Sequence, residues 1–214
     1  RRSGRTHLKI MAIHPVSVQN TFGSHFILWS FFLPLMALIF VPLVLPDQTL
    51  AQSEVEMVAS LGVDIAGMTQ TVDHHFATLF IDSGVMSKTQ AFFTSSKGWT
   101  LDFASNWIHG VWLMLYKATW RFYALKSIFL LPLLVLAIPA AVDGFMVRST
   151  KKYRFESSNP VFFYSSMHTM VLMFGLFAFL PLAPFSLSAV ALLVIVVLLI
   201  SGIWLTTSNF QTGA

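Results

Sequence analysis

The sequence predicts an all-α, polytopic helical membrane protein with about four transmembrane helices and an outer amphipathic helical hairpin. Apolar residues make up 56% of the 214 residues and charged residues only 10%, and the mean hydropathy of +0.72 exceeds what a soluble domain needs. Several apolar segments reach the roughly 20 residues that a helix needs to cross a hydrocarbon core about 30 Å thick. Basic residues gather beside these segments, as expected for loops that stay in the cytoplasm.

The predicted spans lie at 26–45, 128–147, 161–182 and 187–205. The first carries no charge and two internal prolines, and we interpret it as a retained anchor; a cleaved signal peptide is the alternative. The second is the weakest, because Asp143 and Gly144 interrupt its downstream end. The third contains His168, and the fourth is the most uniformly aliphatic.

Basic residues set the predicted orientation, because short loops rich in Lys and Arg resist translocation. Such residues precede the first span and separate the second from the third: Arg1, Arg2, Arg5 and Lys9, then Arg148, Lys151, Lys152 and Arg154. Segments 1–25, 148–160 and 206–214 are therefore predicted to be cytoplasmic, and segment 46–127 lies outside. If residues 1–10, which precede the first methionine, are foreign to the natural protein, the loop alone sets the same topology.

The outer segment 46–127 contains two amphipathic patterns. Apolar residues recur at spacings of three and four from Val55 to Phe80, which predicts a helix that Asp47 could cap. A second pattern starts near Leu101 and is rich in Trp and Tyr, as in an interfacial helix. Its basic residues are expected to reach toward lipid phosphates: Lys117, Arg121 and Lys126. Together these helices predict a hairpin that lies on the membrane or packs on the bundle; binding of a partner through the apolar stripe is the alternative.

Signals for catalysis or cofactor binding are scarce. The absence of cysteine excludes disulfides, thiolate chemistry and iron–sulfur clusters. The nearest metal motif is Asp73-His74-His75, but adjacent helical residues point about 100° apart and chelate one ion poorly, so a solvated polar face is favoured. No Gly-rich phosphate loop, HExxH or GxSxG is present. We predict no enzyme activity, no metal and no cofactor.

One carboxylate and one imidazole fall within the predicted spans. Asp143 stands near the inner end of the second, and His168 lies about 13 Å into the third, counted from Asn159. Because a short loop joins these spans, they are antiparallel neighbours and the two side chains form a candidate intramembrane polar pair. A structural pairing of Asp143 with Lys151 or Arg154 is favoured, and proton transfer is the alternative.

The stretch AAVDGFMVRSTKKYRFESSNP, residues 140–160, carries a signature in which Asp-Gly ends a span, Arg and a basic run follow, and Glu-Ser-Ser precedes the next span. The matching positions are Asp143, Gly144, Arg148, Glu156 and Ser157. This arrangement resembles an uncharacterised family of membrane proteins encoded by integrating conjugative elements and conjugative plasmids. The chain departs from that pattern at Asn159-Pro160 and around His168.

The resemblance implies an accessory of a conjugative DNA-transfer (type IV secretion) system at the bacterial inner membrane. Together with the scarcity of catalytic motifs, it predicts a non-enzymatic accessory or scaffold component. Its implied partners are the lipid bilayer and other membrane subunits, without direct nucleic-acid binding; the basic balance of +4 reflects topology, and a homo-oligomer fits this role. The alternatives are a small proton-coupled transporter or channel-like subunit using Asp143 and His168, or a protein that excludes incoming elements. We also predict salt bridges within the loop among Asp143, Arg148, Lys151, Arg154 and Glu156.

Overall fold

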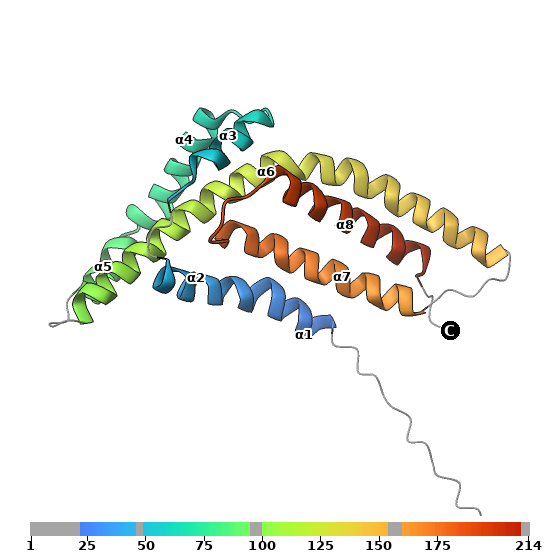
Figure 1. The fold of residues 1–214 in the computed structure, drawn as a ribbon, viewed down its shortest axis with the longest axis horizontal. Helices are drawn as coiled ribbons and strands as arrows, with labels where there is room; N and C mark the ends of the chain where they lie inside the picture. The colour runs from blue at the N-terminus through green and yellow to red at the C-terminus, as the bar shows by residue number, and fades with distance from the viewer. Residues whose placement is uncertain (1–21, 46–48, 95–99, 154–159, 211–214) are drawn as a thin grey trace, which may run out of the picture.

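The computed structural model describes residues 22–45, 49–94, 100–153 and 160–210, and every regular element within these ranges is a helix (Figure 1). This confirms the all-α prediction. In the described ranges, the helical segments long and apolar enough to cross a membrane are Phe22–Val44, Asp102–Lys151, Val161–Leu182 and Ala189–Ser208. The chain therefore has the helices of a polytopic membrane protein.

The bundle contains the first span, which comprises α1 (Phe22–Ile27), the π-helical turn η1 (Leu28–Phe32) and α2 (Leu33–Val44), and also α6 (Thr100–Tyr153), α7 (Pro160–Phe179) and α8 (Ala189–Ser208). Helix α8 packs against both α6 and α7, and the first span packs on α7 (Figure 1). The start of α1, the end of α6, the start of α7 and the end of α8 share one end of the bundle. The turn between α7 and α8 lies at the other end.

Helix α6 differs from the prediction, which separated an interfacial helix near Leu101 from a span that starts at 128. The structure joins the two in one helix of 54 residues. The physical reason is that residues 111–131 contain neither Gly nor Pro, so nothing ends the helix between them. Pro132 and Pro139 lie farther along inside the helix, where membrane helices tolerate proline. At 1.5 Å per residue, α6 is about 80 Å long and extends well beyond a bilayer core of about 30 Å.

The outer helix predicted from Val55 to Phe80 is also divided. It consists of α3 (Gln52–Ser60), α4 (Ile65–Phe76) and the π-helical turn η2 (Ala77–Ile81), and α5 (Val85–Thr94) follows. Gly62 follows α3 with φ of 84°, a left-handed conformation that favours glycine. Asp64 then caps α4 by accepting a hydrogen bond from the Gly67 amide at 3.2 Å. The predicted cap Asp47 lies outside the described residues.

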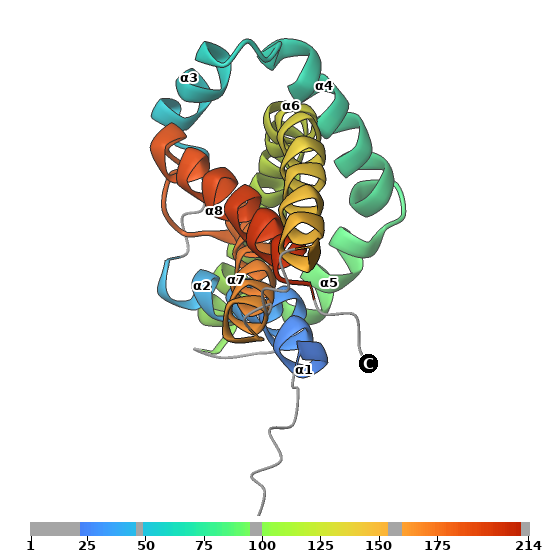
Figure 2. The ribbon, with the colours of Figure 1, turned by 90° about the vertical axis from the view of Figure 1, so that its right-hand side faces the viewer.

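The outer helices curve around one side of α6 (Figure 2). A buried cluster that includes Val72 and Trp120 joins α3 and α4 to α6. A neighbouring cluster that includes Phe76 and Trp112 continues this contact along α4 and α6. Within the bundle, Phe129, Met173 and Leu199 belong to a cluster that joins α6, α7 and α8. Helix α6 thus contributes to every cluster and connects the outer layer to the membrane bundle.

Candidate functional site

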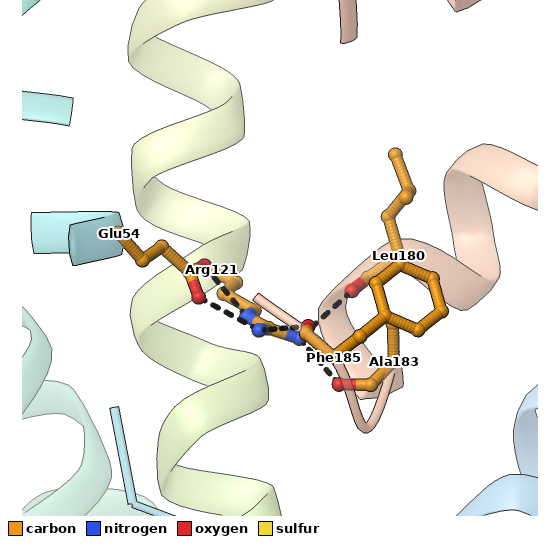
Figure 3. A network of polar contacts seen from close by, with 5 residues as sticks. All are labelled: Glu54, Arg121, Leu180, Ala183 and Phe185. Atoms are coloured by element: carbon orange, nitrogen blue, oxygen red, sulfur yellow. Dashed lines mark hydrogen bonds and ion pairs between the residues drawn. The ribbon is translucent and has the colours of Figure 1, made fainter. Parts of the chain in front are cut away.

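The most elaborate polar site in the described part of the chain surrounds Arg121, at the middle of α6 (Figure 3). Its Nε and Nη2 atoms donate hydrogen bonds to the two carboxylate oxygens of Glu54, each at 2.7 Å. This is the bidentate geometry that a planar guanidinium forms best with a carboxylate. A residue of the membrane-crossing helix is thereby bonded to α3 of the outer layer.

The same guanidinium binds the turn between α7 and α8. Nη1 donates to the carbonyl oxygens of Leu180 at 3.3 Å and Ala183 at 2.6 Å, and Nη2 donates to that of Phe185 at 2.7 Å. Together with the two bonds to Glu54, all five N–H donors of Arg121 are used. We call Arg121, Glu54 and these carbonyls the arginine anchor.

The local sequence explains why this turn offers so many carbonyls. Helix α7 ends at Phe179 and continues as a single 3-10 turn, η3 (Leu180–Leu182). The last carbonyls of a helix lack partners within the helix. Pro181 and Pro184 have no amide N–H to offer them. The guanidinium supplies the missing donors from outside the turn.

Burial determines what the arginine anchor can do. The side chains of Arg121 and Glu54 are each 1% exposed. Removing both charges from water costs several kcal/mol per ion, which close pairing and full hydrogen bonding offset. Because no donor of Arg121 remains, a ligand would have to displace one of its present partners. The arrangement is suited to fixing three segments in one geometry.

Sequence reasoning missed this site. It assigned Arg121 and Lys117 to lipid phosphates, but both side chains are buried in the structure, so that prediction is wrong for them. Lys126 is exposed, and its contact with lipid phosphates stays a prediction. The available signal was periodicity: Glu54 lies four residues before the buried Val58, on the apolar face of α3. A carboxylate on such a face requires a cation.

The Asp73-His74-His75 motif holds α4 against α6. Tyr116 donates its hydroxyl to Asp73 at 2.6 Å, and the hydroxyl of Tyr123 lies 2.6 Å from Nδ1 of His75. One turn earlier, the Trp120 indole N–H donates to the Thr69 hydroxyl at 3.2 Å. Two of the three motif residues are therefore bonded to α6, and all three remain exposed, as the predicted solvated face requires. Within the described ranges, no group of three or more His, Cys, Asp or Glu side chains could hold a metal ion.

The signature residues of α6 pack on the end of α8. Asp143 accepts a hydrogen bond from the Trp204 indole N–H at 2.7 Å. Gly144 is buried, and a Cβ atom there would overlap Oγ1 of Thr207 and lie 2.9 Å from the Trp204 carbonyl oxygen. Farther along α6, the same face makes two more contacts. The Arg148 guanidinium lies 5.2 Å from the Phe210 ring centroid, and Lys151 Nζ donates to Asn209 Oδ1 at 3.2 Å. We call this contact face the α6–α8 seam.

The predicted loop salt bridges involve Asp143, Arg148 and Lys151, which the structure describes. Arg154 and Glu156, and with them the signature residue Ser157, lie outside the described residues. Among the described residues, Asp143 forms no ion pair with Arg148 or Lys151, and each has a partner on or just after α8. The predicted pairing of Asp143 with Lys151 is therefore wrong. Lys151 follows Asp143 by eight residues, or about 12 Å along the helix at 1.5 Å per residue, and both side chains face α8 rather than each other.

The predicted intramembrane pair of Asp143 and His168 does not form either. His168 lies against the first span, with its Nδ1 atom 3.3 Å from Nδ1 of His25 and its ring 4.4 Å from the ring of Phe22. Asp143 faces α8 through Trp204. The two polar residues belong to different helix contacts, because α8 packs on α6 where the sequence predicted α7.

Comparison with known protein families identifies the family of this chain. Residues 46–211 match the family described as "IncC plasmid conjugative DNA transfer protein DtrJ-like". The matched range contains the whole arginine anchor and the whole α6–α8 seam. No curated protein and no solved structure matches the chain.

Proposed function

Since the chain belongs to the DtrJ-like family of plasmid conjugative DNA transfer proteins, we propose that it is a non-enzymatic scaffold component of the transfer apparatus, a type IV secretion system, in the bacterial inner membrane. Membership of the family connects the chain with conjugation. The scaffold role, the inner membrane and the absence of enzyme activity are our proposal.

The observation that carries the proposal is the arginine anchor. Arg121 spends all five donors on Glu54 and on the α7–α8 turn. A catalytic or transport residue exchanges hydrogen-bond partners during its cycle. A residue that holds an outer layer on a helix bundle keeps the same partners throughout. Asp73 and His75 are likewise bonded to tyrosines of α6. The polar side chains of these segments thus hold the outer helices in a fixed position on α6.

Exposed aromatic side chains on the outer layer support the proposal that other membrane subunits are the partners. Phe92 of α5 is 72% exposed and Phe103 of α6 is 59% exposed. Helix α5 and the start of α6 lie in the part of the molecule that extends away from the bundle (Figure 1). Exposed large apolar side chains at a protein surface favour association with a partner or with the membrane. The bilayer itself accounts for the apolar side chains around the spans.

The proposed orientation follows the basic residues. His25 contacts His168, and Arg148 contacts Phe210, so the ends predicted to be cytoplasmic lie together. The arginine anchor lies at the opposite end of the bundle, where the outer layer joins it. This arrangement is compatible with cytoplasmic termini and a periplasmic outer layer.

The test is removal of the protein from donor cells. We expect fewer transconjugants per donor with unchanged donor growth, and recovery when the wild-type chain is supplied again. Affinity purification from donor membranes should co-isolate subunits of the secretion apparatus. Unchanged transfer after deletion would refute the proposal. Expression in the recipient alone serves as the control, because a loss of transfer confined to that arrangement would instead support exclusion of incoming elements.

A further inference from the structure

An apolar groove of about 490 Å³ runs between α6 and the end of α7. Phe122, Leu125 and Leu133 line it from α6, and Phe177 and Ala178 line it from α7. Its volume falls within the range of sites that bind small molecules. The lining is apolar except for Lys126, whose side chain stands at the groove.

The position of the groove along the bundle indicates its environment. Pro181 also lines it and belongs to the turn whose carbonyls bind Arg121. Phe122 lines the groove one turn before Lys126. From Lys126 to the far end at Leu133, the groove follows α6 for about 10 Å, at 1.5 Å per residue. That is about two thirds of one leaflet, taken as half of a hydrocarbon core about 30 Å thick. The groove therefore has the length of a partly inserted acyl chain.

The charge at the groove indicates which headgroup fits. Lys126 is exposed, and no carboxylate among the described residues forms an ion pair with it. Its Nζ atom lies 6.0 Å from the ring centroid of Tyr123, an aromatic residue suited to the membrane interface. A lysine beside an apolar groove can keep its stem on the apolar surface and extend its ammonium group to the headgroup level. Phosphate is the anion that this level of a bilayer provides.

We propose that this groove binds one acyl chain of an anionic phospholipid, with the Lys126 ammonium group on the headgroup phosphate. The lipid would lie in the leaflet next to the arginine anchor and cover the apolar contact of α6 with α7. The proposal depends on the membrane location and not on the role in conjugation. Failure of one can therefore be distinguished from failure of the other, because bound lipid and DNA transfer are measured separately.

The experiment is native mass spectrometry of the full chain, purified in detergent and supplied with equal amounts of phosphatidylglycerol and phosphatidylethanolamine. The wild-type chain should retain phosphatidylglycerol preferentially. Lys126→Gln should lower that preference about fivefold, the factor that corresponds to about 1 kcal/mol per basic residue at an anionic surface. Lys126→Arg should keep the preference, because it keeps the charge. Lys88→Gln, an exposed lysine of α5, is the matched control and should change nothing.

A second variant tests the apolar part of the site. Ala178→Phe places a ring in the groove and should reduce retention of both lipids, with helical content and monodispersity checked in parallel. If that variant does not fold, the Lys126 series still decides. Equal retention of the two lipids by the wild-type chain would overturn the proposal. An unchanged preference in Lys126→Gln would overturn it as well.

Discussion

Trp204 donates its indole N–H to the carboxylate of Asp143 at 2.7 Å, and this hydrogen bond joins the signature face of α6 to the end of α8. The partner is neutral, whereas the sequence predicted a basic residue or His168. The acid of the signature therefore contributes to helix packing. Its neighbour Gly144 contributes to the same contact by allowing α8 to approach. Asp143 and Gly144 of the signature thus both serve to pack α6 on the end of α8.

The first prediction concerns Asp143→Asn. An asparagine side-chain oxygen can accept the same indole hydrogen bond, but it cannot carry a proton. We expect protein abundance and transfer frequency close to those of the wild-type chain. Trp204→Phe removes the donor and should lower the free energy of unfolding by about 1 kcal/mol, measured by thermal unfolding in detergent.

Asp102→Asn, at the exposed start of α6, is the control for this substitution. A loss of transfer in Asp143→Asn at normal protein abundance would contradict the packing role. That result would favour the proton-coupled alternative, because the substitution keeps the acceptor oxygen and removes the group that can titrate.

The second prediction concerns the arginine anchor. Glu54→Ala leaves the guanidinium of Arg121 buried without its counter-charge. Breaking a buried ion pair from one side typically costs about 3–5 kcal/mol. We expect a large drop in thermal stability in detergent and in the amount of protein in the membrane. Glu56→Ala on the same helix is the matched control, since that side chain is exposed and should have little effect.

The double substitution of Glu54→Leu with Arg121→Leu separates charge from geometry. Removing both charges should restore part of the lost stability. It should not restore all of it, because the carbonyl groups of Leu180, Ala183 and Phe185 lose their donors. Complete recovery in the double variant would show that the bonds to the turn contribute nothing.

The spans were predictable because run length and hydropathy are local properties of the sequence. The breaks in the outer segment also had local signals, since Gly62 and Gly84 adopt positive φ. The continuity of α6 from the interfacial pattern into the span was predictable, because no Gly or Pro lies between Gly110 and Pro132. The arginine anchor was not, because Arg121 meets Glu54 across 67 positions and Ala183 across 62. No local pattern specifies which segments a buried charge will join.

The same reasoning explains the error at Asp143 and His168. Their pairing was inferred from loop length, which makes the second and third spans neighbours. Loop length does not specify which face of α6 meets which helix. Trp204 of α8 occupies the position opposite Asp143, and His25 of the first span meets His168. Contacts between distant segments determined both partners.

The third prediction concerns Gly144→Ala. The added Cβ atom would overlap Thr207 Oγ1 and approach the Trp204 carbonyl oxygen at 2.9 Å, so α6 and α8 would have to separate. Overpacking of this kind typically costs about 1–3 kcal/mol. Thermal unfolding in detergent measures the loss. Thr207→Ala removes the closest atom and should rescue part of it.

Gly23→Ala is the control for Gly144→Ala, because no atom lies within 4 Å of a Cβ atom built at Gly23. Both positions lie in helices, but Gly23 is the second residue of α1 and Gly144 lies inside α6, so the full interior preference for Ala over Gly applies only at Gly144. Equal stability changes at Gly144 and Gly23 would show that the close approach of α8 is unimportant.

The last prediction concerns the contact of α4 with α6. Tyr116→Phe and Tyr123→Phe each remove one hydroxyl from the bonds to Asp73 and His75. Each bond is expected to contribute about 1 kcal/mol, which corresponds to about fivefold faster local opening. Amide hydrogen exchange should therefore accelerate in α4, while exchange in α7 and α8 stays unchanged, because α4 can open without the bundle. Tyr153→Phe, at a side chain 85% exposed, is the control. Unchanged exchange in α4 would mean that apolar packing around Val72 holds this helix without the hydroxyls.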